Sequence, residues 1–198
     1  MTSPTSPGED SADNLEVTVV IPCLNEEKTV GGCVASAIAT MRAAGLAGEV
    51  IVADNGSRDA SCERATAAGA RIVNVARRGY GSALMAGIAA ARGRFVIMGD
   101  ADASYDFSDV PRFVVKLREG FDLVQGCRLP RGGGTVAPGA MPWSHRWIGN
   151  PALSLLARLF FRTGLNDIYC GLRGFTRDFA ARMDQRCTGM EFATEMIV

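Results

Sequence analysis

The sequence lacks several features that mark common classes of protein. Its six cysteines form no C-x-x-C pair and no zinc-ligand spacing, so no zinc site is predicted. No apolar stretch reaches the roughly 18–20 residues that a membrane-spanning helix requires. The sequence begins without a signal peptide, and we therefore expect reduced thiols in a cytosolic compartment.

Histidine and lysine are also scarce. His145 is the single histidine, and a lone histidine in a loop is more often structural than catalytic. Lys28 and Lys116 are the only lysines, so nearly all positive charge is carried by arginine. The net charge is zero, but residues 1–110 carry −5 and residues 111–198 carry +5. The basic second half suits phosphate or an anionic membrane surface, whereas no basic and aromatic pattern indicates nucleic acid.

Short apolar runs alternate with helical segments along the chain. Strands are predicted at 17–21 (ended by Pro22), 49–53, 71–75, 94–98 and 121–125. Helices are predicted from Asn25 or Glu26 toward Ala44, up to Ala68, after Gly79-Tyr-Gly81 through Ala91, and from Ser108 to Glu119. This alternation is typical of an α/β fold, in which helices cover both faces of a mostly parallel sheet.

The two ends of the chain and one long internal stretch differ from this pattern. Residues 1–14 are predicted to be a disordered lead-in. Residues 130–150, rich in glycine and proline, form a loop too long for a simple connection. Residues 147–162 predict an amphipathic helix that either packs on the sheet or lies at a membrane interface. The chain stops at 196–198 without a helix cap, which indicates a fragment.

Four polar clusters follow predicted strands, where the ligands of parallel sheets bind. They are Asn25-Glu26, Asp54, Arg77-Arg78 and Asp100-Ala101-Asp102. Closely spaced carboxylates such as Asp100 and Asp102 suit a hard divalent cation, Mg²⁺ or Mn²⁺. A dehydrogenase is not predicted, because Pro22-Cys-Leu-Asn25 stands where the glycine fingerprint of a dinucleotide site belongs.

Four motifs in series carry a resemblance to a known family. They are Val19-Val-Ile-Pro-Cys-Leu-Asn-Glu26, Val52-Ala-Asp-Asn-Gly-Ser-Arg-Asp59, Gly99-Asp-Ala-Asp102 and Cys170-Gly-Leu-Arg-Gly-Phe175. Together they resemble family 2 glycosyltransferases with the GT-A fold, closest to the branch that acts on polyprenyl (dolichol) phosphate. The resemblance implies one GT-A catalytic domain over residues 15–198, truncated at its C-terminus.

The resemblance also assigns residues to the nucleotide sugar. The expected contacts are Pro22, Leu24, Asn25, Glu26, Asp54, Asn55, Arg78, Gly79, Asp100 and Ala101. Asp54 matches the position that hydrogen-bonds the base, and Gly79 opens a helix whose dipole favours phosphate. The alternative for Asn25 is an N-cap in a strand-to-helix turn, and Asp59 can simply cap the next helix.

Metal ligands in the resemblance are Asp100 and Asp102, bound directly or through water. Asp102 is the stronger candidate and the catalytic one, because the metal neutralises charge on the leaving nucleoside diphosphate. Ser104 replaces a glutamine that many relatives carry, which puts a third ligand in doubt. Asp106 either compensates or belongs to a turn before a helix.

Acceptor residues are expected in the second half of the chain. Arg128, Arg146 and Arg173 match arginines that can hold a phosphate through their guanidinium forks. Asp167 either positions the acceptor or acts as a base, so Asp102, Asp167 and Arg128 are the predicted catalytic residues. Arg173 can instead pair with Asp167 or Asp178, and Glu191 and Glu195 are weaker candidates for a base.

The resemblance therefore implies an inverting, metal-dependent hexosyltransferase. Its donor is a UDP- or GDP-linked sugar and its acceptor a polyprenyl phosphate, at the cytoplasmic side of a membrane. Further C-terminal residues can include transmembrane helices. Two alternatives stay open: a family member that glycosylates a saccharide hydroxyl, and a nucleotide-binding module without turnover.

Overall fold

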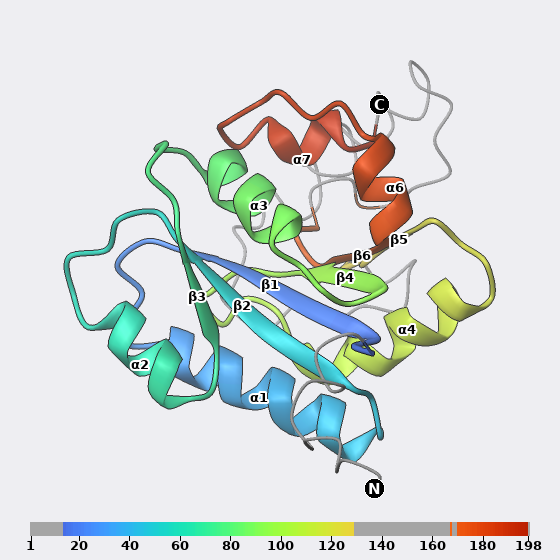
Figure 1. The fold of residues 1–198 in the computed structure, drawn as a ribbon, viewed down its shortest axis with the longest axis horizontal. Helices are drawn as coiled ribbons and strands as arrows, with labels where there is room; N and C mark the ends of the chain where they lie inside the picture. Colours follow the sequence, from blue (N-terminus) through green and yellow to red (C-terminus); the bar gives the residue numbers. More distant parts are fainter. Residues whose placement is uncertain (1–13, 129–166, 168–169, 198) are drawn as a thin grey trace, which may run out of the picture.

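A six-stranded, mostly parallel sheet forms the centre of the molecule (Figure 1). The computed structural model describes residues 14–128, 167 and 170–197. The strands are β1 (Val17–Cys23), β2 (Gly48–Asp54), β3 (Arg71–Asn74), β4 (Phe95–Met98), β5 (Leu123–Gln125) and β6 (Arg173–Thr176). Their order in the sheet is β3-β2-β1-β4-β6-β5, and the first four strands pair in parallel.

Helices cover both faces of the sheet, as predicted. They are α1 (Val30–Ala43), α2 (Ser61–Ala67), α3 (Tyr80–Ala89), α4 (Val110–Arg118), α6 (Arg177–Arg182) and α7 (Phe192–Glu195), with a 3₁₀ turn η1 (Phe107–Asp109) before α4. In Figure 1, α1, α2 and α4 lie on one face, and α3, α6 and α7 lie on the other. Each face buries its own apolar cluster.

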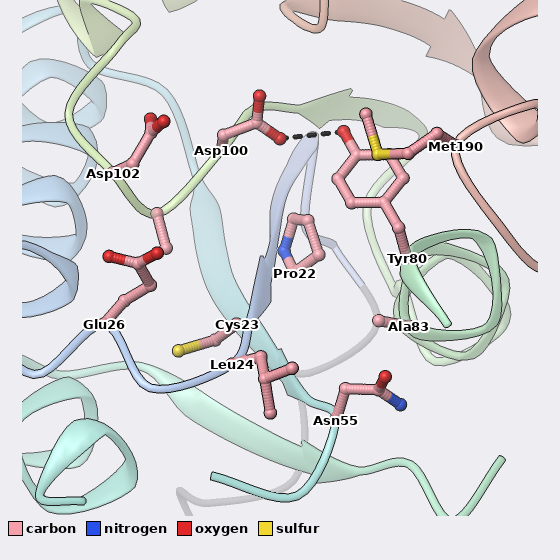
Figure 2. A pocket seen from close by; sticks show the side chains of 11 residues that line it. Pro22, Cys23, Leu24, Glu26, Asn55, Tyr80, Ala83, Asp100, Asp102 and Met190 are labelled. Carbon is pink, nitrogen blue, oxygen red and sulfur yellow. Dashed lines mark hydrogen bonds between the residues drawn. The ribbon is translucent and has the colours of Figure 1, made fainter. Parts of the chain in front are cut away.

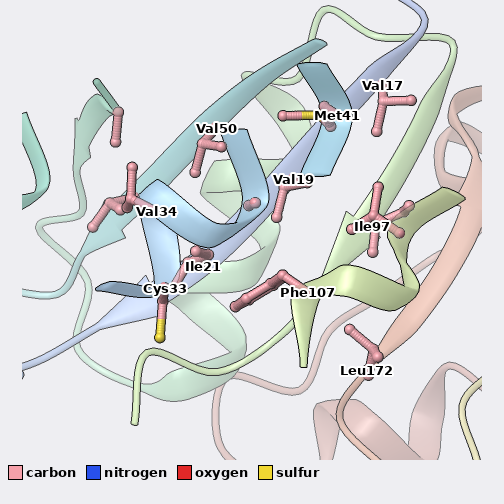
Figure 3. Close-up of a cluster of buried hydrophobic side chains, with 14 of the residues drawn as sticks. Val17, Val19, Ile21, Cys33, Val34, Met41, Val50, Ile97, Phe107 and Leu172 are labelled. Atoms are coloured by element: carbon pink, nitrogen blue, oxygen red, sulfur yellow. The ribbon is translucent and has the colours of Figure 1, made fainter. Parts of the chain in front are cut away.

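Alternation along β1 supplies both clusters. Val17, Val19 and Ile21 point to the face of α1, where Figure 3 shows Val17 near Met41 and Ile21 near Cys33, whereas Val20 belongs to the cluster under α3. All four of these β1 side chains are fully buried. Successive side chains of a strand point to opposite faces, so a strand buried on both sides is apolar at nearly every position.

The sequence predicts that the first strand ends before Pro22, and this prediction is wrong. β1 continues to Cys23, and Pro22 pairs with Ala53 of β2. On its other side β1 pairs with β4 from Val17 to Val20, so this pairing ends before Pro22. Proline is tolerated here because no third strand lies opposite it on that side.

The helix predicted from Asn25 or Glu26 begins later, at Val30. Asn25 has φ +59°, a left-handed conformation that an α-helix cannot include. Thr29 rather than Asn25 therefore occupies the N-cap position. The loop between β1 and α1 is therefore four or five residues longer than predicted, and it extends the carboxyl edge of β1, where the site lies.

The strand β6 is not predicted from the sequence. It pairs antiparallel with β4 on one side and with β5 on the other, so it separates two strands that follow each other in the chain. Part of the Cys170–Phe175 motif thus forms a strand in the sheet. The other five strands form within two residues of their predicted bounds.

Several sequence predictions lie outside the described residues. These are the lead-in up to residue 13, the loop at 130–150, the helix at 147–162, Arg146 and His145. Within the part of the chain that the structure describes, no helix combines the length and apolarity needed to cross a membrane.

Candidate functional site

A cavity of about 340 Å³ opens at the carboxyl edge of the parallel strands (Figure 2). Its lining residues come from the end of β1, the loop after β2, the start of α3, the loop after β4 and a turn before α7; they are Pro22, Cys23, Leu24, Glu26, Asn55, Tyr80, Ala83, Asp100, Ala101, Asp102 and Met190. Two of the four predicted polar clusters line this cavity, through Glu26 and through Asp100, Ala101 and Asp102, and Asn55 lines it next to the third cluster, Asp54.

The loop after β1 and the loop after β2 are joined by hydrogen bonds at this edge of the sheet. The amide of Asn25 donates to Ser57 Oγ at 2.9 Å, and Asn25 Oδ1 accepts from the amide of Arg58 at 2.8 Å. The amide of Glu26 donates to Ser61 Oγ at 2.8 Å. Because Asn25 uses both backbone and side chain in this way, its left-handed conformation is fixed before any ligand binds. Asp59 accepts from the amide of Ser61, the first residue of α2.

Asn55 connects the loop after β2 to the start of α3. Its Nδ2 donates to the carbonyl of Arg77 at 2.8 Å, and its Oδ1 accepts from the amide of Gly79 at 2.8 Å. Arg78 Nη1 donates to the carbonyl of Asn55 at 2.5 Å. The predicted contact of Arg78 with phosphate is untested, but its guanidinium already holds the loop after β2.

Asp54 is 5% exposed and closes its own turn. Its carboxylate accepts from the amides of Gly56, at 3.0 Å, and Ser57, at 3.1 Å. Two backbone donors on one carboxylate stabilise a turn of fixed shape. The hydrogen bond from Asp54 to a base stays a prediction, and Asn55 is the neighbour that lines the cavity.

Asp100 is held from two sides. Tyr80 Oη donates to Asp100 Oδ1 at 2.7 Å, as Figure 2 shows. On the other side, a methyl group placed on Gly171 would lie 3.0 Å from Asp100 Oδ2 and 2.9 Å from Tyr105 Oη. Tyr105 Oη in turn accepts from the amide of Gly171 at 2.7 Å. Burial raises the pKa of the Asp100 carboxyl, and the charge of Asp102 raises it further.

Asp102 is exposed and keeps most of its hydrogen-bonding capacity. Its Oδ1 accepts from the amide of Ser104 at 2.9 Å. Together with Asp100 it gives a pair of hard oxygen donors on one cavity wall, and a cation would offset their mutual repulsion. The pair therefore fits Mg²⁺ or Mn²⁺. Within the described residues, no cluster of three or more His, Cys, Asp or Glu side chains forms.

Asp106 has a structural role in the turn before α4. Its Oδ1 accepts from the amide of Ser108 at 2.8 Å, so Asp106 is the N-cap of η1. The turn before a helix, which was one of the two alternatives, is therefore present, and a metal contact of Asp106 stays a prediction. A cation at Asp100 and Asp102 needs its further ligands from water or a bound phosphate.

Arg128 and Asp167 form an ion pair. Arg128 Nε lies 2.9 Å from Asp167 Oδ2, and Nη2 lies 3.0 Å from Oδ1, in the two-pronged geometry that suits a carboxylate. The amide of Arg128 donates to Oδ2 as well. Burial lowers the pKa of Arg128, but the hydrogen bonds and charge of Asp167 outweigh burial, so the pKa is raised overall. Arg128, not Arg173, is thus the partner of Asp167.

Arg173 is fully buried inside β6. Its guanidinium donates to the carbonyls of Cys170 and Ala193. Burial lowers its pKa. This position favours a structural role over the predicted contact with an acceptor phosphate, because a phosphate could reach Arg173 only after the surrounding chain moves.

The start of α3 is covered by the segment 187–191. The amide of Ser82 donates to the carbonyl of Thr188 at 3.2 Å, and Gly79, at φ +127°, lies so close to that carbonyl that a methyl group would be 2.1 Å from it. Met190 of this segment borders the cavity with a 69% exposed side chain. Protein carbonyls therefore occupy part of the helix end that was expected to face phosphate.

Sequence reasoning missed Tyr80, Tyr105 and Met190. Tyr80 lies between the two glycines of Gly79-Tyr-Gly81, and only the glycines of this motif indicate a nucleotide contact. Tyr105 follows the acidic pair closely, which is the one signal that could have identified it. Nothing in the local sequence places Met190, because the turn that carries it reaches the cavity only through tertiary packing. Glu195 accepts from the amides of Arg186 and Cys187 in this turn.

Comparisons with known proteins agree with this geometry. The model of the family described as glycosyl transferase family 2 matches residues 18–184. The low-salt glycan biosynthesis hexosyltransferase Agl6 of Haloferax volcanii is 39% identical over 183 residues, which are 92% of this chain and 43% of that protein. Undecaprenyl-phosphate 4-deoxy-4-formamido-L-arabinose transferase of Salmonella paratyphi A is 30% identical, over 90% of this chain and 55% of that protein.

A solved structure extends the likeness to three dimensions. Glucosyl-3-phosphoglycerate synthase from Mycobacterium tuberculosis, in complex with Mn²⁺, UDP and glucosyl-3-phosphoglycerate, has a TM-score of 0.72 and 26% identity over 98% of this chain and 70% of that one. A further structure of that enzyme holds Mg²⁺ and UDP. This chain spans about half the length of the two curated relatives named above. Its fold is GT-A, and the chain belongs to glycosyl transferase family 2.

Proposed function

We propose that this chain is the catalytic part of an inverting, metal-dependent glycosyltransferase that moves a sugar from a nucleoside diphosphate to a polyprenyl phosphate. The observation that carries the proposal is the cavity at the carboxyl edge of the sheet. It brings Glu26, Asn55, Asp100 and Asp102 together in a chain that belongs to a family of sugar transferases.

The donor lies across this edge in the proposal. The nucleoside contacts Pro22 and Leu24, and the rigid loops around Asn25 and Asn55 position it without a cost in loop ordering. The diphosphate points to Asp100 and Asp102. A Mg²⁺ or Mn²⁺ ion bound there would act as a Lewis acid that neutralises charge on the leaving group.

The state of Asp167 favours a phosphate acceptor. Both of its carboxylate oxygens accept from Arg128, and its side chain is fully buried, so it is poorly placed to take a proton from an acceptor hydroxyl. A lipid phosphate is already ionised near neutral pH and needs positioning rather than a base. Arg128, with a 24% exposed side chain, and Arg146 are the proposed phosphate contacts.

Membrane association belongs to the same proposal. A polyprenyl acceptor lies in a bilayer, so the whole protein works at its cytoplasmic surface, where nucleotide sugars are available. The name of the Salmonella relative includes undecaprenyl phosphate, which supports a lipid acceptor. The amphipathic helix that the sequence predicts at 147–162 is the proposed membrane contact.

A second candidate keeps the donor chemistry and changes the acceptor. The structures of glucosyl-3-phosphoglycerate synthase include complexes with phosphoglyceric acid, a small water-soluble acceptor. A hydroxyl on a soluble molecule or a saccharide would require a base other than Asp167, and Glu26 is the remaining carboxylate of the cavity outside the acidic pair.

The test is a transfer assay with labelled UDP- and GDP-sugars, Mn²⁺ and three acceptors: a short polyprenyl phosphate, an oligosaccharide and 3-phosphoglycerate. We expect label in the polyprenyl phosphate product only.

Asp102→Asn should lower the rate about a hundredfold or more, since the metal contributes several kcal/mol. Asp106→Asn is the matched control and should retain activity, because asparagine also serves as an N-cap. Label in the oligosaccharide or phosphoglycerate would contradict the lipid acceptor, and donor binding without any transfer would favour the non-catalytic alternative.

A further inference from the structure

A second cavity, of about 730 Å³, lies at the opposite edge of the sheet, where β4 begins and β6 ends. Its lining residues are Asn14, Leu15, Arg92, Arg94, Leu117, Gly120, Asp122, Thr176, Arg177, Asp178 and Arg182. The cavity that contains Asp100 and Asp102 is at the other end of β4. No role in sugar transfer therefore accounts for this group of four arginines.

Sheet register brings two of these arginines together. Phe95 of β4 pairs with Thr176 of β6, so Arg94 and Arg177 are the next residues beyond that pair. The amide of Arg177 donates to the carbonyl of Arg94 at 2.9 Å, which extends the ladder by one step. Arg94 immediately precedes β4, and Arg177 is the first residue of α6. This hydrogen bond therefore places two exposed arginines side by side at one edge of the sheet.

A third arginine joins the pair through the loop before β4. Arg177 Nη1 donates to the carbonyl of Arg92 at 3.1 Å, which holds the Arg177 guanidinium at the Arg92 backbone. Among the described residues, no carboxylate lies within ion-pair distance of the guanidinium groups of Arg92, Arg94 or Arg177. The guanidinium of Arg94 lies over the Phe95 ring, 4.9 Å from its centroid.

The carboxylates near this cavity either pair with other arginines or are too few to neutralise the four arginines of the lining. Glu49 accepts from Arg71 through both oxygens, at 2.8–3.0 Å, and Glu16 pairs with Arg118 at 2.7 Å. Asp122 lies 3.5 Å from Arg182, at the long end of an ion pair. Asp122 and Asp178 are the two acids of the lining, against four arginines, so the cavity keeps a positive charge.

We propose that this cavity binds a phosphate group. Guanidinium groups suit phosphate oxygens because their planar donors match them in pairs. A bound phosphate would provide one anion for several of the arginines that line this cavity. The group can come from a soluble phosphate ester or from the headgroup of an anionic lipid. This inference does not depend on the proposed sugar transfer, because the two cavities share no residue.

The experiment titrates inorganic pyrophosphate into the metal-free protein and follows backbone amide signals by NMR. EDTA is present, which removes the divalent cations that would bring pyrophosphate to Asp100 and Asp102. We expect shifts at Gly93, Arg94 and Arg177, and at least tenfold weaker binding in R94Q/R177Q. R94Q alone is the milder variant if the double variant folds poorly. R112Q is the control, since Arg112 is highly exposed and pairs with Asp109 away from the cavity.

Two outcomes would overturn the proposal. One is pyrophosphate binding of equal strength in R94Q/R177Q and in the unchanged protein. The other is shifts confined to residues around Asp100 and Asp102. A sedimentation arm then separates the two sources of phosphate, with vesicles of phosphatidylglycerol or of phosphatidylcholine. Binding to phosphatidylglycerol alone, lost in R94Q/R177Q, supports a lipid headgroup. Pyrophosphate binding without vesicle binding supports a soluble ester.

Discussion

The carboxylate of Asp100 illustrates how single side chains prepare this site. Tyr80 donates to one oxygen and Gly171 approaches the other, so Asp100 has little rotational freedom. Burial, followed by the charge of Asp100, raises the pKa of Tyr80, which therefore remains a hydrogen-bond donor throughout the physiological range. A ligand that is already oriented binds a cation without a further cost in side-chain entropy.

Tyr80→Phe should therefore weaken Mn²⁺ binding while leaving the fold intact. The lost hydrogen bond to a charged group is worth about 1.5 kcal/mol, or roughly tenfold in affinity. Mn²⁺ titration followed by electron paramagnetic resonance measures it directly. Tyr105→Phe is the matched comparison and should weaken Mn²⁺ binding less, because Tyr105 has no described hydrogen bond to Asp100 and affects it only through Gly171. Equal Mn²⁺ affinity in Tyr80→Phe and the unchanged protein would contradict the positioning role.

At this scale the sequence predicts which residues reach the site better than it predicts their partners. Asn25, Asp54 and Asp100 follow strands, so their position at one edge can be inferred from the strand pattern. The pairing of Arg128 with Asp167 cannot, because it joins residues 39 apart in sequence and depends on how two loops meet. Asp54 was assigned to a ligand, yet the amides of its own turn occupy its carboxylate.

At the scale of elements, the contact between α3 and the segment 187–191 shapes one wall of the cavity. A methyl group on Gly81 would lie 2.3 Å from the carbonyl of Cys187 and 2.9 Å from Phe192 Cβ. Gly81→Ala should lower the free energy of unfolding by about 1–3 kcal/mol, as expected for overpacking. Gly32→Ala in α1 is the control: nothing lies within 4 Å, so it should stabilise by about 0.5–1 kcal/mol. Urea unfolding measures both, and equal stability of the two variants would refute the close contact.

The same segment should respond to pH through Glu195. Hydrogen bonds from the backbone amide of Cys187, first, and of Arg186 lower the pKa of Glu195. A folded-state pKa below the unfolded value gives stabilisation above the unfolded value of about 4.3, which is lost as the pH falls through the folded value. The unchanged protein should therefore be more stable than Glu195→Gln at pH 7, with a smaller difference at pH 3. A stability difference that stays constant between these two pH values would contradict the stabilising role of the hydrogen bonds to Glu195.

Element prediction succeeds where periodicity is strong and fails where geometry is irregular. The apolar runs of β1, β2 and β4 are recognisable because both of their faces are buried. The strand β6 has the sequence Arg-Gly-Phe-Thr, with a buried arginine and a glycine, which no strand pattern favours. The late start of α1 depends on the left-handed Asn25, a conformation set by contacts with another loop.

For the whole molecule, strand order separates what local pattern can and cannot predict. Alternating strands and helices predict a parallel sheet, and β1 to β4 confirm it. The insertion of β6 between β4 and β5 requires a contact between distant segments, for which the sequence gives no local signal. That insertion matters for function, because it brings Gly171 against Asp100 and Asp167 against Arg128.

The central claim is that Asp100 and Asp102 hold a metal ion that meets a nucleoside diphosphate in the cavity at the carboxyl edge of the sheet. A crystal structure with Mn²⁺ and UDP, with data collected at the manganese absorption edge, tests it most directly. The account predicts one anomalous peak within coordination distance of Asp102 and of the UDP diphosphate, with the nucleoside against Pro22 and Leu24. A manganese peak away from both aspartates, or UDP bound outside this cavity, would contradict it.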